Sequence, residues 1–214
     1  LIDGSVCGRV VAAAMLAAAS SAHAVQVFFD DFESDTISAG DFDVYGSGST
    51  DGPDLVKWTI LQGNVDIVSS SAFPCAGNQC IDVDGTGSPA PLIMQTKATF
   101  SANLGDKIFI SFTYFGTNSG DFDPFVLSFG GLGIHMHADL FLPQTFNIGP
   151  FSPRNTIVNQ PLILEVTEAP NNFGPFIDNI GLEIVSQPIP VPATALLLAS
   201  GVAGLAGMRA RRKK

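Results

Sequence analysis

The chain has 214 residues, with 10 basic against 20 acidic residues and a formal net charge of −10 at pH 7. This length predicts one domain, and the acidic balance argues against nucleic acids and anionic lipids as partners. No G-x-S-x-G, P-loop or H-E-x-x-H motif is present, so the sequence offers no recognisable catalytic or nucleotide-binding signature.

The first segment is typical of a secretory signal peptide. Arg9 precedes an apolar stretch over Val10–Ala19, and an A-x-A cleavage motif ends at Ala24. We therefore interpret residues 1–24 as a signal helix that passes the chain to the Sec translocon and is cleaved off before Val25.

The last segment has three parts in series: a proline-spaced lead, an uncharged apolar run over Ala193–Met208 and a basic end. The run is shorter than the ~20 residues of a comfortable membrane span, but bilayer thinning and snorkelling arginines can cover the difference. The basic end should stay in the cytoplasm, which places the rest of the chain outside it. The lead is Ile189, Pro190, Val191, Pro192 and Ala193, and the basic residues are Arg209, Arg211, Arg212, Lys213 and Lys214.

This three-part end resembles the PEP-CTERM sorting signal of Gram-negative bacteria, in its V-P-x-P-A variant. The resemblance implies a sorting tail over residues 188–214, with a transmembrane helix over residues 193–208. It also implies an exosortase in the inner membrane that recognises the tail and cuts near the prolines. Ile189 stands at the first motif position and the common glutamate is missing. An ordinary C-terminal membrane anchor is the alternative.

Removal of both ends leaves residues 25–187 as the predicted exported domain. This part holds four basic and nineteen acidic residues, a formal net charge of −15, which suits solubility and divalent cations. Cys7 is lost with the signal peptide, so Cys75 and Cys80 remain and are expected to form a disulfide in an oxidising compartment. A C-x4-C metal site is the alternative, although no second Cys or His pair accompanies it.

Apolar residues alternate with period two through residues 25–187, and no helical period is sustained. Roughly nine or ten strands predict an all-β fold, an antiparallel β-sandwich. Asp41–Asp54 is rich in Gly, Ser and Asp and is expected to be a long loop, and Ser186–Pro192 is expected to be a linker. The main runs are Val56–Ile60, Asn64–Ser69, Cys80–Asp84, Leu92–Phe100, Ile108–Tyr114, Phe125–Phe129, Gly133–Ala138, Leu162–Val166 and Ile180–Ile184.

Four stretches resemble the galactose-binding-like jelly roll of exported bacterial proteins, which includes carbohydrate-binding modules. They are F-F-D-D-F-E-S-D from Phe28, W-T-I-L-Q-G-N-V-D-I-V from Trp58, G-N-Q-C-I-D-V-D-G from Gly77 and G-P-F-I-D-N-I-G-L-E-I from Gly174. The resemblance implies a jelly-roll sandwich in which a structural Ca²⁺ joins the first and last strands through acidic side chains.

The acids expected at this calcium site are Asp31, Glu33 and Asp178. Asp178 shares strand parity with Ile180 and therefore falls on a core-facing position, where a carboxylate must be paired, hydrogen-bonded or metal-bound. Hard oxygen ligands suit Ca²⁺. The alternative is a solvated acidic turn, with Asp178 accepting backbone N–H groups.

Two further groups are candidates for binding. His135, His137 and Asp139 share one face of a predicted strand, which fits a metal or acid–base site as well as a solvated face. Tyr45 lies in the predicted loop and is the aromatic residue expected to be exposed for a sugar ligand. Trp58 shares the parity of its apolar neighbours, which favours core packing.

These features favour an exported, exosortase-sorted surface or matrix protein with a non-catalytic binding or structural role. Extracellular polysaccharide is the expected partner, and the inner membrane holds the chain only transiently before it reaches the cell surface of a Gram-negative bacterium. One alternative is a carbohydrate-active enzyme that uses a pair of carboxylates. Another is a plain membrane-anchored protein.

Overall fold

The computed structural model describes residues 24–37, 41–46, 52, 54–116, 124–137, 143–168 and 174–187. Ala24–Ser186 forms one compact unit, and the described residues contain strands but no helix. The described residues therefore contain no helix that is long and apolar enough to cross a membrane. The predicted signal helix, the sorting tail and its transmembrane helix lie outside the described residues.

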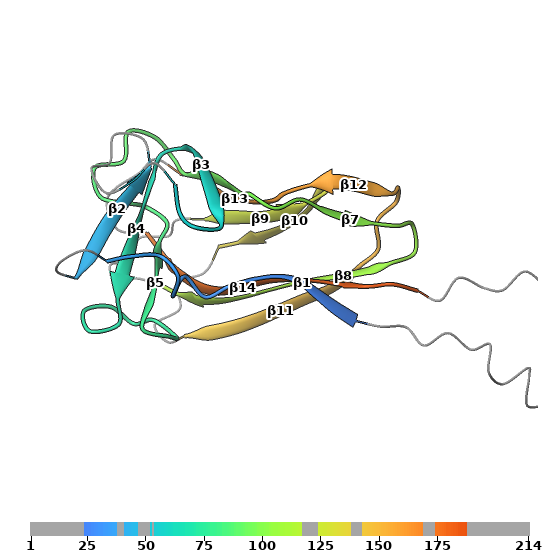
Figure 1. The fold of residues 1–214 in the computed structure, drawn as a ribbon, viewed down its shortest axis with the longest axis horizontal. Coiled ribbons are helices and arrows are strands. Elements are labelled where there is room, and N and C mark those ends of the chain that lie inside the picture. Colours follow the sequence, from blue (N-terminus) through green and yellow to red (C-terminus); the bar gives the residue numbers. More distant parts are fainter. Residues whose placement is uncertain are drawn as a thin grey trace, which may run out of the picture. The chain divides into compact units, whose positions relative to one another are not determined.

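Two antiparallel sheets form the layers of a sandwich, as the period-two pattern predicted (Figure 1). The first sheet contains β1 (Ala24–Asp30), β2 (Phe42–Gly46), β4 (Asn64–Ser69), β5 (Gln79–Asp82), β8 (Lys107–Phe115), β11 (Gln144–Phe151) and β14 (Phe176–Val185). The second contains β3 (Trp58–Gln62), β6 (Ile93–Thr96), β9 (Phe125–Phe129), β10 (Leu132–Met136) and β13 (Leu162–Val166). A short ribbon joins β7 (Phe100–Ala102) to β12 (Ile157–Gln160).

The first sheet runs in the order β11-β8-β14-β5-β4-β2, and β14 also pairs with β1. One edge of β14 pairs with β8. The other edge is divided, because Phe176 and Ile177 pair with β5 whereas Ile180–Val185 pairs with β1. Asp178 and Asn179 fall at this division, where the register against β8 shifts and Asn179 has a φ of 52°. Such a bulge re-aims the side chains next to it.

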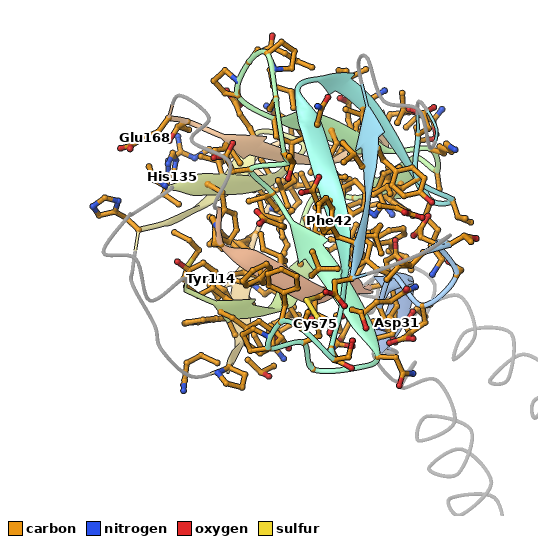
Figure 2. All side chains as sticks on the ribbon, turned by 90° about the vertical axis from the view of Figure 1, so that its left-hand side faces the viewer. Asp31, Phe42, Cys75, Tyr114, His135 and Glu168 are labelled. Carbon is orange, nitrogen blue, oxygen red and sulfur yellow. A yellow bond between two sulfur atoms is a disulfide. The ribbon has the colours of Figure 1, made fainter. Side chains whose placement is uncertain are left out.

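Apolar residues on alternate positions of the two sheets fill the space between the layers (Figure 2). Phe112 of β8 meets Phe125 of β9 edge to face, with ring centroids 5.6 Å apart. Phe28 of β1 meets Trp58 of β3 in the same way at 5.5 Å. Each pair joins a residue of one sheet to a residue of the other, in the geometry that aromatic quadrupoles favour.

Asp30 also joins the two layers, although it is an acid and its side chain is fully buried. Its Oδ2 accepts the Nε1–H of Trp58 at 2.8 Å. Its Oδ1 accepts the N–H of Phe32 at 3.1 Å and lies 3.0 Å from Nζ of Lys57. A buried carboxylate is tolerated when donors and a counter-charge surround it in this way.

Two expectations about strands are wrong. Asp41–Asp54 is not one long loop, because Phe42–Gly46 forms β2 and pairs with β4. The polar composition hid a strand whose Asp43 and Tyr45 are both buried. Leu92–Phe100 is not one strand but contributes to β6 and β7. Thr96 ends β6 with its own side chain, which donates to the carbonyl of Ala98 and accepts the N–H of Leu162.

Replacing Trp58 with Phe should keep the aromatic packing but remove one donor from the buried Asp30. We expect Trp58→Phe to lower the free energy of unfolding by ~1–3 kcal/mol, the usual cost of leaving a buried acceptor unsatisfied. Urea denaturation followed by circular dichroism measures this change. Val56→Ala, at an exposed neighbouring position, should change it by less than about 0.5 kcal/mol. Equal effects of the two variants would contradict this role of Asp30.

Candidate functional site

The predicted disulfide is confirmed: Cys75 and Cys80 are bonded with an S–S distance of 2.07 Å. Both sulfurs are therefore used, and the alternative C-x4-C metal site is wrong. The bond closes a short loop over Ala76–Gln79 at the start of β5. This loop brings two of the predicted calcium ligands together in an unexpected way.

Four consecutive backbone N–H groups of the loop donate to two carboxylates. Ala76 and Gly77 donate to Oδ2 of Asp178, at 3.1 and 3.2 Å. Asn78 and Gln79 donate to Oε1 of Glu33, at 2.5 and 3.2 Å. The side-chain amide of Asn78 donates to the second oxygen of Glu33 at 3.1 Å. Glu33 and Asp178, from opposite ends of the domain sequence, are thus both hydrogen-bonded to one disulfide-closed loop.

Asp178 is fully buried, but the core-facing position predicted from its parity with Ile180 is wrong. The register shift in β14 breaks that parity: Ile177 and Ile180 pack in the main core, whereas Asp178 lies on the other face of the sheet, against the Ala76–Gln79 loop. Its remaining oxygen, Oδ1, accepts the N–H of Asn179 at 2.7 Å. Burial raises the pKa of Asp178 to about 6, although the three backbone hydrogen bonds oppose this rise and the charge of Glu33 adds to it.

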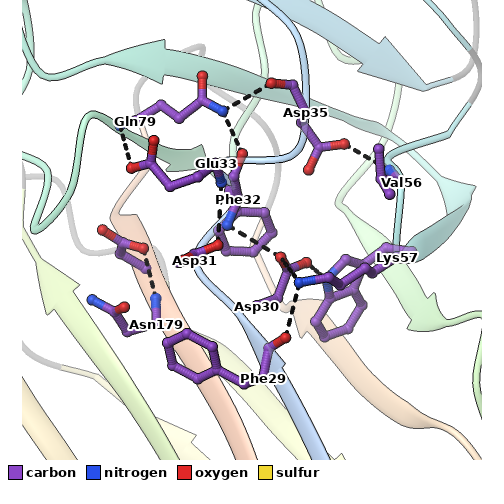
Figure 3. Close-up of polar contacts among 12 residues, drawn as sticks. Phe29, Asp30, Asp31, Phe32, Glu33, Asp35, Val56, Lys57, Gln79 and Asn179 are labelled. Carbon is purple, nitrogen blue, oxygen red and sulfur yellow. Dashed lines mark hydrogen bonds and ion pairs between the residues drawn. The ribbon is translucent and has the colours of Figure 1, made fainter.

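The third predicted ligand, Asp31, makes a different contact and, among the described residues, no hydrogen bond to the Ala76–Gln79 loop. Its Oδ1 accepts the N–H of Glu33 at 3.3 Å and closes a local turn (Figure 3). The carboxylates of Glu33 and Asp178 are occupied by amide donors, and no group of three or more Asp, Glu, His or Cys in the described part of the chain is arranged to hold a metal ion. The calcium site at these three acids therefore stays a prediction.

Asp35 completes the acidic N-terminal turn. Its Oδ1 accepts the N–H of Val56 at 2.6 Å, whereas its buried Oδ2 has no hydrogen-bond partner. Gln79 donates from its side chain to the carbonyls of Phe32 and Asp35 (Figure 3). Burial raises the pKa of Asp35, and the hydrogen bond from Val56 lowers it. The acidic turn therefore acts as a structural connector between β1, β3 and β5.

A second group of acids, which the sequence analysis missed, lies on β4 and β5. Asp66 and Asp82 are cross-strand partners, and both are buried together with Asp84. Asp82 accepts the N–H groups of Asp84 and Gly174, each at 3.0 Å. Burial raises the pKa of Asp82 well above its ordinary value, and the charges of Asp66 and Asp84 raise it further. The alternation of Asp82, Val83 and Asp84 at the end of β5 was the sequence signal that could have indicated this group.

The other candidates do not join these acids. His135 lies on β10 and is exposed, at the left of the view in Figure 2, whereas Asp31 lies at the lower right. His137 follows the end of β10, and Asp139 lies outside the described residues, so their common metal site stays a prediction. Tyr45 is buried and donates its hydroxyl to the carbonyl of Thr36 at 2.6 Å. The expectation that it is exposed is wrong, whereas the core position predicted for Trp58 is confirmed.

A small depression of about 150 Å³ lies on the outward face of the first sheet, and we call it the sheet hollow. Gly181 of β14 is buried at its floor, directly opposite Ser111 of β8. A Cβ on Gly181 would lie 2.5 Å from Oγ of Ser111, so only a glycine leaves this space open. The hollow is lined by Gln26, Phe109, Ser111, Asn147, Gly181, Leu182 and Glu183.

The side chains around the sheet hollow come from four adjacent strands. Gln26 of β1 is opposite Glu183 of β14, which is opposite Phe109 of β8. Asn147 of β11 is opposite Ser111. The side chains of Gln26, Ser111, Asn147 and Glu183 make no hydrogen bond to the described residues. They offer amide, hydroxyl and carboxylate groups beside a half-buried aromatic ring, with the exposed Phe29 opposite Gly181.

No protein-family model matches the chain, and no curated protein matches it. Several solved structures are similar to it. The family 11 carbohydrate-binding module of Clostridium thermocellum shares 16% identity over 76% of this chain and 96% of that one, with a TM-score of 0.37. The CBM22-1 xylan-binding domain of Paenibacillus barcinonensis Xyn10C shares 12% identity over 78% and 99%, with a TM-score of 0.40.

A GH51 α-L-arabinofuranosidase in complex with arabinose is similar at 9% identity and a TM-score of 0.48. The match covers 61% of this chain but only 23% of the enzyme. This chain therefore spans about a quarter of the length of that relative.

Replacing Asp82 with Asn should remove a buried charge and keep the acceptor for Asp84 and Gly174. Because the pKa of Asp82 is raised in the folded state, its charge costs stability above the unfolded pKa, near 3.8, and costs nothing below it. We therefore expect Asp82→Asn to melt higher than the wild type at pH 7, with the difference vanishing towards pH 4. Thermal unfolding at a series of pH values tests this, and a pH-independent difference would contradict it.

Proposed function

We propose that this protein is an exported, non-catalytic protein that binds polysaccharide through the sheet hollow. The observation that carries the proposal is a set of four polar side chains around Gly181, beside an aromatic ring, that make no hydrogen bond to any residue the structure describes. Binding sites typically combine apolar surface with a few well-placed polar groups that fix orientation. Sugars present both an apolar C–H face and a ring of hydroxyl groups, so the two kinds of surface here suit them.

The rigidity of the sheet hollow supports recognition by a preformed surface. Its side chains stand on β1, β14, β8 and β11, which are joined by continuous antiparallel pairing. Sites on strands hold their side chains more firmly than sites on loops. A sugar that binds here therefore needs to order few protein groups, which lowers the entropic cost of association.

The same lining favours binding over hydrolysis. Glycoside hydrolases use two carboxyl groups, ~5–9.5 Å apart, on either side of the bond that is cut. Among the residues that line the sheet hollow, Glu183 is the only acid. Asp66, Asp82 and Asp84 are buried, and Asp66 and Asp82 accept backbone hydrogen bonds, so these acids are not presented to a polysaccharide. We therefore propose no catalytic residues.

Export and sorting complete the proposal and depend on the chain ends. The signal peptide would direct the chain through the Sec translocon, and an exosortase would recognise the tail over residues 188–214. One observation supports delivery outside the cytoplasm: the disulfide, which persists in oxidising compartments. The destination would be the cell surface or the surrounding polysaccharide matrix.

Asn147→Ala should weaken polysaccharide binding without unfolding the chain, because the Asn147 side chain is exposed and makes no hydrogen bond within the described part of the chain. We expect affinity for a bound neutral polysaccharide to fall about tenfold, the value of one or two lost hydrogen bonds. Affinity electrophoresis in gels that contain xylan, galactan or mixed-linkage glucan measures it. Gln144→Ala on the same strand, outside the hollow, is the matched control. Retained affinity in Asn147→Ala, or no retardation by any of these polysaccharides, would contradict the proposed site.

The proposed processing makes a prediction about mass. Expressed in a Gram-negative host that has an exosortase, the recovered protein should begin at Val25 and lack Arg209–Lys214. In a strain without the exosortase it should keep the tail and stay with the membrane fraction. Intact-mass spectrometry of both fractions measures these species. A tail that is retained in both strains would indicate an ordinary anchor instead.

A further inference from the structure

A second and larger cleft, of about 650 Å³, lies between the β9–β10 turn and the segment that leads into β12. We call it the turn cleft, and it is bounded by Gly130–Leu132 on one side and by Ser152–Val158 on the other. Gly130 has a φ of 56°, and a Cβ on it would lie 2.4 Å from Ile157. The glycine therefore lets the turn pack directly against β12 and fixes one wall of the cleft.

The turn cleft differs in charge from the rest of the domain. No Asp or Glu is among the residues that line it, although residues 25–187 contain nineteen acids. Arg154, the one arginine among the described residues, lines the cleft and is exposed. Lys107 stands at its border, because its Nζ donates to Oγ of the lining residue Ser152 at 2.6 Å. The acid next to it in sequence, Asp106, is buried and accepts the N–H of Asn103.

The basic side chains of the described unit are otherwise occupied. Lys57 pairs with Asp30, and Lys97 donates to the carbonyl of Leu55 at 2.7 Å. Arg154 alone among these basic side chains has no hydrogen bond or ion pair with the described residues. An unpaired guanidinium in a cleft without acids, on a strongly acidic protein, is a ready partner for an anion.

We propose that the turn cleft binds the carboxylate of an acidic sugar, with Arg154 as its principal ligand and Lys107 as a second positive charge. Planar guanidinium groups bind carboxylates through two parallel N–H···O bonds. Asn155 and Gln160 can bind sugar hydroxyl groups, and the exposed Val158 can pack against the C–H face of a sugar ring. The volume matches that of sites for small ligands, about 300–1,000 Å³.

Other anions fit the cleft less well. A nucleotide base is usually held by an aromatic side chain, and none lines the cleft. A densely charged polyanion would meet the repulsion of a domain with a formal net charge of −15. A uronic-acid glycan carries one charge per sugar, which a single guanidinium can match. The inference shares its class of ligand with the proposed function but uses a different site.

Isothermal titration of the full-length chain with trigalacturonate, and with the same trisaccharide reduced at its carboxyl groups, tests the inference. We expect the acidic trisaccharide to bind and the reduced one to bind at least tenfold more weakly. Arg154→Gln should weaken binding of the acidic form tenfold or more, and Arg154→Lys should weaken it less. The unfolding midpoint of each variant should equal that of the wild type, because Arg154 is exposed and makes no hydrogen bond or ion pair with the described residues.

The hollow variant Asn147→Ala separates this inference from the proposed function, because it should leave trigalacturonate binding unchanged. Equal binding of the acidic and reduced trisaccharides would overturn the inference, as would unchanged affinity in Arg154→Gln. Displacement by inorganic phosphate as effective as that by trigalacturonate would also overturn it, since the cleft would then be a general anion site. In each of these cases, neutral polysaccharide bound through Asn147 would leave the proposed function standing.

Discussion

The buried carboxylate of Asp30 is the contact on which the arrangement of the two sheets depends most. It ends the first strand of one sheet and accepts hydrogen from Trp58, a core residue of the other sheet. Lys57 and the N–H of Phe32 satisfy its other oxygen. Removing any of these partners would leave a buried carboxylate less satisfied, which is costly, so Asp30 favours the arrangement of the layers in which all of them meet it.

Other acids of the chain are satisfied mainly by hydrogen bonds from backbone N–H groups rather than by positively charged side chains. The described residues include four basic side chains, too few to neutralise the acids that the fold buries. Asp178 and Glu33 share the N–H groups of Ala76–Gln79, and Asp66 accepts both the N–H and the hydroxyl of Thr86. The disulfide shapes the loop that supplies four of these donors. Because the described residues include only four basic side chains, the exposed Arg154 is one of few positive charges at the surface.

Period-two alternation was enough to predict the sandwich, because one face of each strand is packed against a common core. It also predicted the core position of Trp58, whereas Asp178 lies on the other face of its sheet because a register shift breaks the parity of β14. The expected export to an oxidising compartment predicted the bond between Cys75 and Cys80. Tyr45 was misjudged because its strand is rich in loop-forming residues, and only the pairing with β4 reveals it. The sheet hollow could not be predicted at all. Gln26, Ser111, Asn147 and Gly181 are far apart in sequence, and only strand register brings them together.

The division of β14 between two neighbours has a consequence for the order in which the domain assembles. β1 finds its only strand partner in the described structure in β14, the last strand of the unit. The first strand to be synthesised must therefore wait, unpaired, until the last has been made. Contacts between such distant segments form slowly. Under the proposed export through the Sec translocon, this delay would keep the chain unfolded, and able to pass through the channel, until the whole domain has been synthesised.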